Sequence, residues 1–162
     1  MLLPIVRVLI FVVLILPALG LSGVVERPMF ASPLVPQPTP VKENKGMSDY
    51  RGVAIGMATD DVRKSLGNPQ DKSDTMDLYT FSADESAQFY YGAAKTVTAI
   101  MITFSGELKD APPPKAILGE DVEAKPDGSI FKMVRFPKAG YWISYNRTPP
   151  PDAIVNIALQ KM

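Results

Sequence analysis

Over roughly the last hundred residues, hydrophobic and polar positions alternate in short runs that are separated by turn residues. Runs of this kind, rich in β-branched and aromatic side chains, predict half-buried β-strands. We predict six strands, over residues 78–81, 87–91, 97–104, 131–136, 141–145 and 154–159. Within the run 97–104, the alternation places Ile100, Ile102 and Phe104 on one side, and we expect this side to meet helices.

A short helix is predicted before each group of three strands. The first begins at Thr59, whose hydroxyl can cap free N–H groups, and continues with Asp60 and Asp61 near the positive end of the helix dipole. Gly67 ends it. The second is predicted over residues 113–118, where the prolines suit a first turn. Neither helix is long enough to persist alone in water, so both must pack on the sheet.

The two groups follow the same order of helix and strands, which indicates a duplicated supersecondary unit. We place the repeats at about residues 50–106 and 111–162. Short helices followed by meandering strands predict an α+β domain. The expected fold is therefore two tandem helix-plus-three-strand repeats that form one antiparallel, six-stranded sheet, with the short helices on one face.

The amino-terminal region has the features of a targeting segment. Residues 1–7 carry one cation, residues 8–16 are apolar, and Ala18-Leu19-Gly20 offers a small-x-small cleavage pattern. We assign residues 1–23 as a signal peptide or an uncleaved membrane anchor, residues 24–48 as a Pro-rich linker, and residues 49–162 as the duplicated domain.

Both interpretations of the amino terminus place the domain outside the cytoplasm. A cleaved signal predicts a periplasmic or secreted protein. An uncleaved one predicts an inner-membrane anchor, with membrane contact through residues 1–25. The two alternatives remain open at this point.

The segment from Gly56 to Pro69 carries a Gly-Met-x-x-x-x-Val-x-x-x-Leu-Gly-x-Pro pattern. In this it resembles the family that contains the small outer-membrane lipoprotein of the β-barrel assembly machine. A tandem version of the unit resembles the β-lactamase inhibitor proteins. The resemblance covers residues 50–106, and residues 113–160 join it by analogy. It implies a fold and a habit of binding other proteins, with no catalytic residues.

The chain departs from both families in one respect, since it contains no cysteine. The lipidated cysteine of the lipoprotein and the paired cysteines of the inhibitor proteins are both missing. The lipoprotein's mode of membrane attachment therefore does not transfer to this chain.

Composition narrows the range of functions. The 17 basic and 17 acidic residues balance, which argues against a nucleic-acid partner, and histidine is absent. The acidic pairs stand at predicted helix starts or turns, where carboxylates are locally favoured: Asp60-Asp61, Asp84-Glu85 and Glu120-Asp121. We predict no catalytic residues, no cofactor and no metal site, and hence a non-enzymatic protein.

Trp142, Ser144 and Asn146 share one face of the strand 141–145 and its extension, so the chain's one tryptophan lies among polar side chains. Such a ring is typical of an interface anchor. We expect Tyr90 and Lys132 to join it in a protein-binding patch. The alternative is that Trp142 is half-buried against its cross-strand neighbours.

The resulting hypothesis is an exported, non-enzymatic envelope protein that binds another envelope or membrane protein through a sheet surface. The alternative hypothesis is a membrane-anchored accessory subunit of a larger membrane complex.

Overall fold

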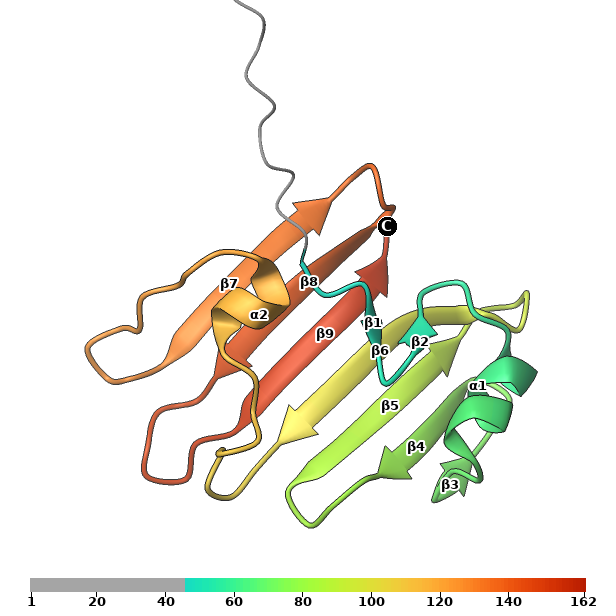
Figure 1. The fold of residues 1–162 in the computed structure, drawn as a ribbon, viewed down its shortest axis with the longest axis horizontal. Helices are drawn as coiled ribbons and strands as arrows, with labels where there is room; N and C mark the ends of the chain where they lie inside the picture. Colours follow the sequence, from blue (N-terminus) through green and yellow to red (C-terminus); the bar gives the residue numbers. More distant parts are fainter. Residues whose placement is uncertain (1–45) are drawn as a thin grey trace, which may run out of the picture. The chain divides into compact units, whose positions relative to one another are not determined.

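The computed structural model describes residues 46–162, and its main element is an antiparallel sheet of seven strands (Figure 1). In spatial order the strands are β3 (Asp71–Lys72), β4 (Met76–Thr80), β5 (Glu85–Tyr91), β6 (Val97–Phe104), β9 (Val155–Lys161), β8 (Tyr141–Arg147) and β7 (Ile130–Phe136). A separate small sheet pairs β1 (Asp49–Tyr50) with β2 (Val53–Ala54). The helices are α1 (Thr59–Leu66) and α2 (Pro114–Leu118).

The fold class is α+β, mostly sheet with a few short helices, as the sequence predicts. The proposed signal peptide or anchor and most of the Pro-rich linker lie outside the described residues. Within residues 46–162, no helix has the length and apolar character needed to cross a membrane.

All six predicted strands are present, and the sheet holds one more than predicted. The additional strand is β3, a two-residue edge strand that pairs Asp71 with Leu78 and Lys72 with Asp77. Its residues have no hydrophobic alternation, because both are exposed and paired on one side only. A pattern-based prediction therefore has no signal for it.

Strands β6 and β9 join the two groups of strands at the centre of the sheet. Their pairing runs from Ala99 opposite Gln160 to Phe104 opposite Val155, and it places Ile102 directly opposite Ile157. On each side of this junction the remaining strands follow as an antiparallel meander. Each half of the chain thus begins at one edge of the sheet, at β3 or at β7, and ends at its centre, at β6 or at β9.

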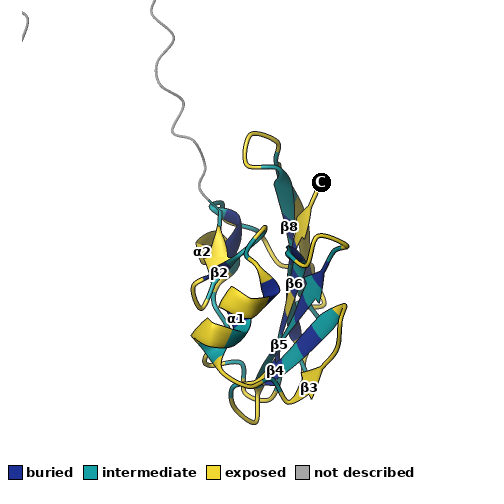
Figure 2. Cartoon of the chain, turned by 90° about the vertical axis from the view of Figure 1, so that its right-hand side faces the viewer, coloured by how far each residue is buried: buried dark blue, intermediate teal, exposed yellow. Residues whose placement is uncertain are grey.

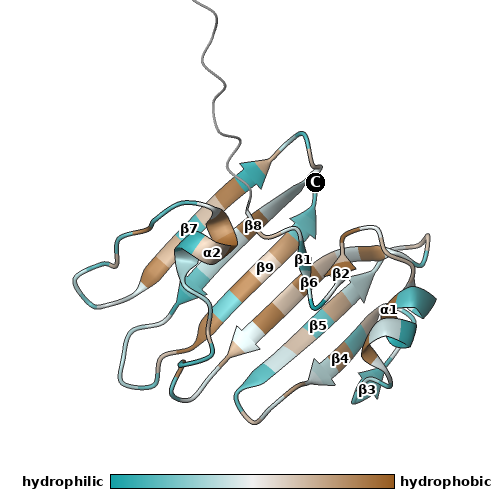
Figure 3. Cartoon of the chain, viewed as in Figure 1, coloured by the Kyte–Doolittle hydropathy of each residue, from teal (hydrophilic) through white to brown (hydrophobic). Residues whose placement is uncertain are grey.

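One face of the sheet carries the core. Both helices and the β1–β2 hairpin lie on this side (Figure 2). The alternation along each strand is visible as bands of hydropathy (Figure 3), and Ile100, Ile102 and Phe104 are buried as predicted. Removal of this alternating apolar surface from water is the main source of stability, because the chain contains no cysteine for disulfides.

The start of α1 differs from the sequence prediction. The N-cap is Ala58 rather than Thr59, since Ala58 has an extended backbone and forms a β-bridge with Thr96. The Thr59 hydroxyl donates to the Lys95 carbonyl at 3.0 Å, so it ties the helix to a neighbouring loop instead of capping it. Gly67 ends the helix as predicted, with φ 84 and its amide bonded to Arg63 O at 2.9 Å.

The second helix begins one residue later than predicted. Pro113 keeps an extended backbone as the N-cap, with φ −69 and ψ 155, and α2 starts at Pro114. Gly119 follows in the left-handed conformation, φ 76, which stops the helix.

Candidate functional site

The second face of the sheet, which we call the open face, carries three rows of side chains. The registers of neighbouring strands align so that each row crosses the sheet from β4 to β7. The first row is Met76, Tyr90, Ala99, Gln160, Trp142 and Arg135. The second is Leu78, Gln88, Met101, Ala158, Ser144 and Met133. The third is Thr80, Ser86, Thr103, Asn156, Asn146 and Phe131.

The open face is poor in charge. Among the residues of the three rows, Arg135 alone carries a charge, and it lies on the edge strand β7. The rows instead hold exposed large hydrophobic side chains, with Met101 41%, Met133 42% and Phe131 60% exposed. Depletion of charge together with aromatic residues and methionine is the composition of the core of a protein interface. This combination makes the open face the candidate binding surface.

Several polar groups of the open face are already paired. The Tyr90 hydroxyl donates to Gln88 Oε1 within β5. Thr103 Oγ1 donates to Asn156 Oδ1 at 2.9 Å, across the β6–β9 junction. Polar groups that keep hydrogen bonds when water leaves are much less costly to bury than unpaired ones. These two pairs therefore limit the penalty of losing water at Tyr90, Gln88, Thr103 and Asn156.

Four of the five predicted binding residues lie on the open face. Tyr90 and Trp142 share the first row, although β5 and β8 are separated by two strands. Ser144 and Asn146 follow Trp142 along β8, one in each of the next rows. Trp142 is half-buried between its cross-strand neighbours Arg135 and Gln160, as the alternative interpretation of this residue stated.

Lys132 does not lie on the open face, so the prediction that it joins Trp142 in one patch is wrong. Its cross-strand partner is Tyr145, which is buried on the helix side of the sheet. Its ammonium lies 3.3 Å from Glu120 Oε1, just after α2. The sequence did not predict which face of the sheet Lys132 occupies, because both alternating sets of residues in β7 contain apolar side chains. One set holds Ile130, Val134 and Phe136, and the other holds Phe131 and Met133.

Met101, Met133 and Phe131 are the open-face residues that the predicted patch omitted. The alternation did place Met101 opposite the buried face of its strand, so a signal existed for that residue. The residue type did not indicate exposure of Met101 or Met133, because methionine is common in protein cores.

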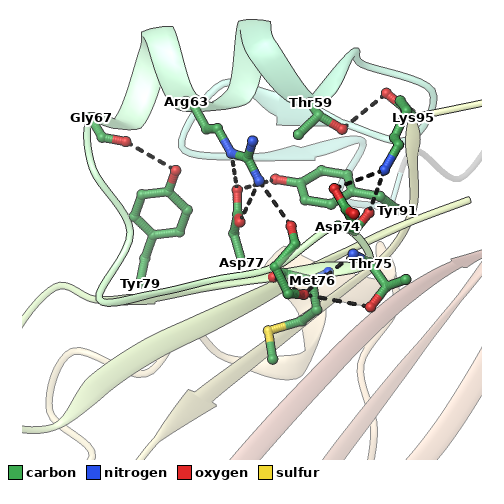
Figure 4. Close-up of polar contacts among 11 residues, drawn as sticks. Thr59, Arg63, Gly67, Asp74, Thr75, Met76, Asp77, Tyr79, Tyr91 and Lys95 are labelled. Carbon is green, nitrogen blue, oxygen red and sulfur yellow. Dashed lines mark hydrogen bonds and ion pairs between the residues drawn. The ribbon is translucent and has the colours of Figure 1, made fainter.

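A second polar cluster lies under α1 (Figure 4). Asp77 on β4 is fully buried, and Arg63 of α1 donates to both of its carboxylate oxygens at 2.8 Å. The Tyr91 hydroxyl donates to the same carboxylate at 2.8 Å, and Arg63 also reaches Ser73 O at 3.0 Å. Burial alone opposes the charge on Asp77, but the bonds from Arg63 and Tyr91 outweigh it and hold the pKa of Asp77 below its ordinary value.

The Asp77 cluster is a tether rather than a reactive site. Within residues 46–162, no buried side-chain nitrogen or oxygen lacks a hydrogen-bond partner. The carboxylate accepts two hydrogen bonds from the helix and one from the sheet, and it is fully buried, so it is not exposed to a substrate in solution. Its effect is to fix α1 against the edge of the sheet.

A third group links the β1–β2 hairpin to the start of β5. Glu85 accepts hydrogen bonds from the Tyr50 hydroxyl and, at 2.8 Å, from the Arg51 guanidinium, which also stacks 4.0 Å from the Phe81 ring centroid. Burial disfavours the charge on Glu85, yet these two donors lower its pKa. The hairpin is thereby anchored to the sheet.

The lowered pKa values of Asp77 and Glu85 predict acid sensitivity. A carboxyl whose pKa is lower in the folded state stabilises the fold above its unfolded pKa, and this contribution is lost as pH falls through the folded pKa. We expect the urea midpoint to decrease between about pH 6 and about pH 3. Glu85→Gln should reduce the size of that decrease, and an unchanged midpoint over this range would contradict the assignment.

Within residues 46–162, no group of three or more acidic side chains could hold an ion. An open hollow beside α1 is lined by Thr59, Arg63 and Lys95, but its cations are engaged. Arg63 is bound to Asp77, and Lys95 pairs with Asp74 at 3.1 Å.

Comparisons with known proteins add little. No family model and no curated protein matches the sequence. One solved structure is similar, a DUF4309 family protein, YjgB, from Bacillus subtilis subsp. subtilis str. 168. The identity is 18%, the TM-score is 0.46, and the match covers 69% of this chain and 84% of that one. We draw no functional conclusion from a likeness of this size.

Proposed function

We propose that this chain is a non-enzymatic, exported protein that binds another protein of the cell envelope through the open face of its sheet. The observation that carries the proposal is the charge-poor surface around Trp142, with Met101, Met133 and Phe131 exposed on it. The partner should present an apolar surface with neutral hydrogen-bonding groups. A strongly charged partner would lose hydration without gaining compensating charges.

We further propose that the two halves are copies of one unit. The order α1, β4, β5, β6 is repeated by α2, β7, β8, β9, and the last strands of the two series pair with each other at the centre of the sheet. This arrangement supports duplication. In it, β5 and β8 are each the middle strand of their group of three. Their aromatic residues Tyr90 and Trp142 then come from matching strands into one row. The resemblance to the assembly lipoprotein and the inhibitor proteins remains a prediction.

The envelope location rests on the sequence of residues 1–23, and one measurement separates its two forms. Amino-terminal sequencing of the native protein should find a start after the small-x-small pattern, Ala18-Leu19-Gly20, if the signal is cleaved. An intact Met1 with retention in the membrane fraction would instead favour the anchored accessory subunit.

Trp142 is the expected anchor of the interface. Once a partner has been co-purified from solubilised envelope, Trp142→Ala should weaken its binding by about 2 kcal/mol, or roughly 30-fold in Kd. Lys64→Ala, an exposed change on α1 away from the open face, is the matched control and should leave the affinity unchanged. Equal losses for the two variants, measured by calorimetric titration, would argue against the open face.

A further inference from the structure

The edge strand β7 has an unpaired outer side. Its seven residues pair with β8 along their full length, from Ile130 opposite Arg147 to Phe136 opposite Tyr141. Within the described part of the chain, no strand pairs with the other side of β7, which lies at the edge of the sheet (Figure 1). Alternate N–H and C=O groups of the strand therefore point outward without a strand partner.

The preceding loop does not occupy this edge through its backbone. The backbone hydrogen bonds of residues 120–129 join Lys125 with Ser129 and Gly128 with Lys125, all within the loop. At the opposite end of the sheet, the edge strand β3 is only two residues long. Natural sheets usually shorten, cover or charge their edges. Strand β7 is long and no described strand covers it, and its charges are Lys132 and Arg135.

We propose that the outer side of β7 pairs antiparallel with β7 of a second copy of this chain, centred on Met133. In this register all seven residues of each strand are paired. Met133 lies opposite Met133 of the second copy, and Phe131 lies opposite Arg135. The remaining pairs are Lys132 with Val134 and Ile130 with Phe136. The contact is two-fold symmetric, the commonest arrangement of soluble homo-oligomers.

The side chains of β7 are complementary to themselves in this register. Phe131 and Arg135 both point to the open face, so each copy can place a guanidinium against the exposed ring of the other. The central pair is apolar. A shift of the centre to Lys132 would put that lysine opposite its own copy, which is unfavourable. The register centred on Met133 is therefore favoured because it pairs all seven residues of β7 and places no like charges opposite each other.

Long-range electrostatics do not oppose the association. The formal net charge of the chain is zero, so two copies do not repel each other strongly. The charge on Lys132 is partly balanced within its own chain by Glu120 at 3.3 Å. Paired in this way, two copies form one continuous sheet, and their open faces lie side by side on the same surface.

The absence of cysteine from the sequence allows a direct test by single-cysteine crosslinking of the full chain in mild detergent. Under mild oxidation, Met133→Cys should give a covalent dimer of twice 17.7 kDa as the main product. Met101→Cys is the matched control, because Met101 is 41% exposed against 42% for Met133 and lies on the same face but on the inner strand β6. It should stay monomeric. Equal or greater crosslinking through position 101 would overturn the edge pairing.

A charge experiment tests the symmetry without a disulfide. Met133→Lys and Met133→Glu should each halve the mass measured by analytical ultracentrifugation, because position 133 faces itself. Mixing the two variants should restore the dimer. A wild-type chain that sediments as a monomer, or a dimer that persists in both single variants, would overturn the proposal. Met133 and Phe131 also belong to the open face, so the binding of a different protein is tested separately with Trp142→Ala on the inner strand β8.

Discussion

Replacing Asp77 with alanine should destabilise the fold by about 3 kcal/mol, the largest effect that we expect from a polar substitution. The change leaves Arg63 without the carboxylate that binds it twice, and Tyr91 without its acceptor. Loss of one member of a buried ion pair is costly because the remaining charge is poorly solvated. Arg63 retains some contact with water, with 23% of its side chain exposed, so the lower end of the usual range applies.

Urea unfolding of the full chain, followed by circular dichroism, measures this difference. Asp74→Ala is the matched control, because the Asp74 side chain is 96% exposed and pairs with Lys95 at the surface. Its effect should stay below about 1 kcal/mol. If the two alanine variants unfold at the same urea concentration, the Asp77 cluster does not hold α1 to the sheet.

Ile157→Ala should destabilise the fold by about 2–5 kcal/mol, because it opens a cavity where the two groups of strands meet. Ile157 on β9 is 1% exposed and lies opposite Ile102 on β6. The loss combines the transfer free energy of the removed methyl and methylene groups with that of an unfilled cavity.

Gln160→Ala is the control on the same strand, since Gln160 is exposed on the open face. A surface change of this kind should alter the free energy of unfolding by less than about 0.5 kcal/mol. In urea, both variants should show one transition, with fluorescence of Trp142 and circular dichroism changing together. Two separate transitions would mean that the halves fold independently and that the β6–β9 junction adds little.

The strands were predictable wherever one face is buried and the other is not. The run Val97–Phe104 was placed with its observed bounds, because its alternation is strong over eight residues. The two-residue strand β3 was missed, since exposed edge residues carry no alternation. Thr59 was assigned as a cap on local preference, but the β-bridge of Ala58 with Thr96, far along the chain, decides where the helix starts.

The candidate site was predictable only in part. The alternation along β8 was sufficient to group Trp142, Ser144 and Asn146. Lys132 was assigned to the wrong face, because the burial of β7 depends on which of two apolar sets meets α2, and this is a tertiary property. The buried Asp77 was not foreseen either. A carboxylate in a strand normally points to water, and only the arrival of Arg63 from α1 makes its burial favourable.

The proposed docking surface can be tested most directly by site-specific photo-crosslinking in the cell. We expect benzoylphenylalanine in place of Ser144 to give one discrete adduct with a different protein, because this position lies in the middle row of the open face, between Trp142 and Asn146 on β8. The same group in place of Lys64, exposed on α1, should give none. The Ser144 adduct should disappear when Met101→Glu introduces a charge in the same row, two strands away on β6. Adducts that are the same from both positions, or that persist with Met101→Glu, would contradict binding through the open face.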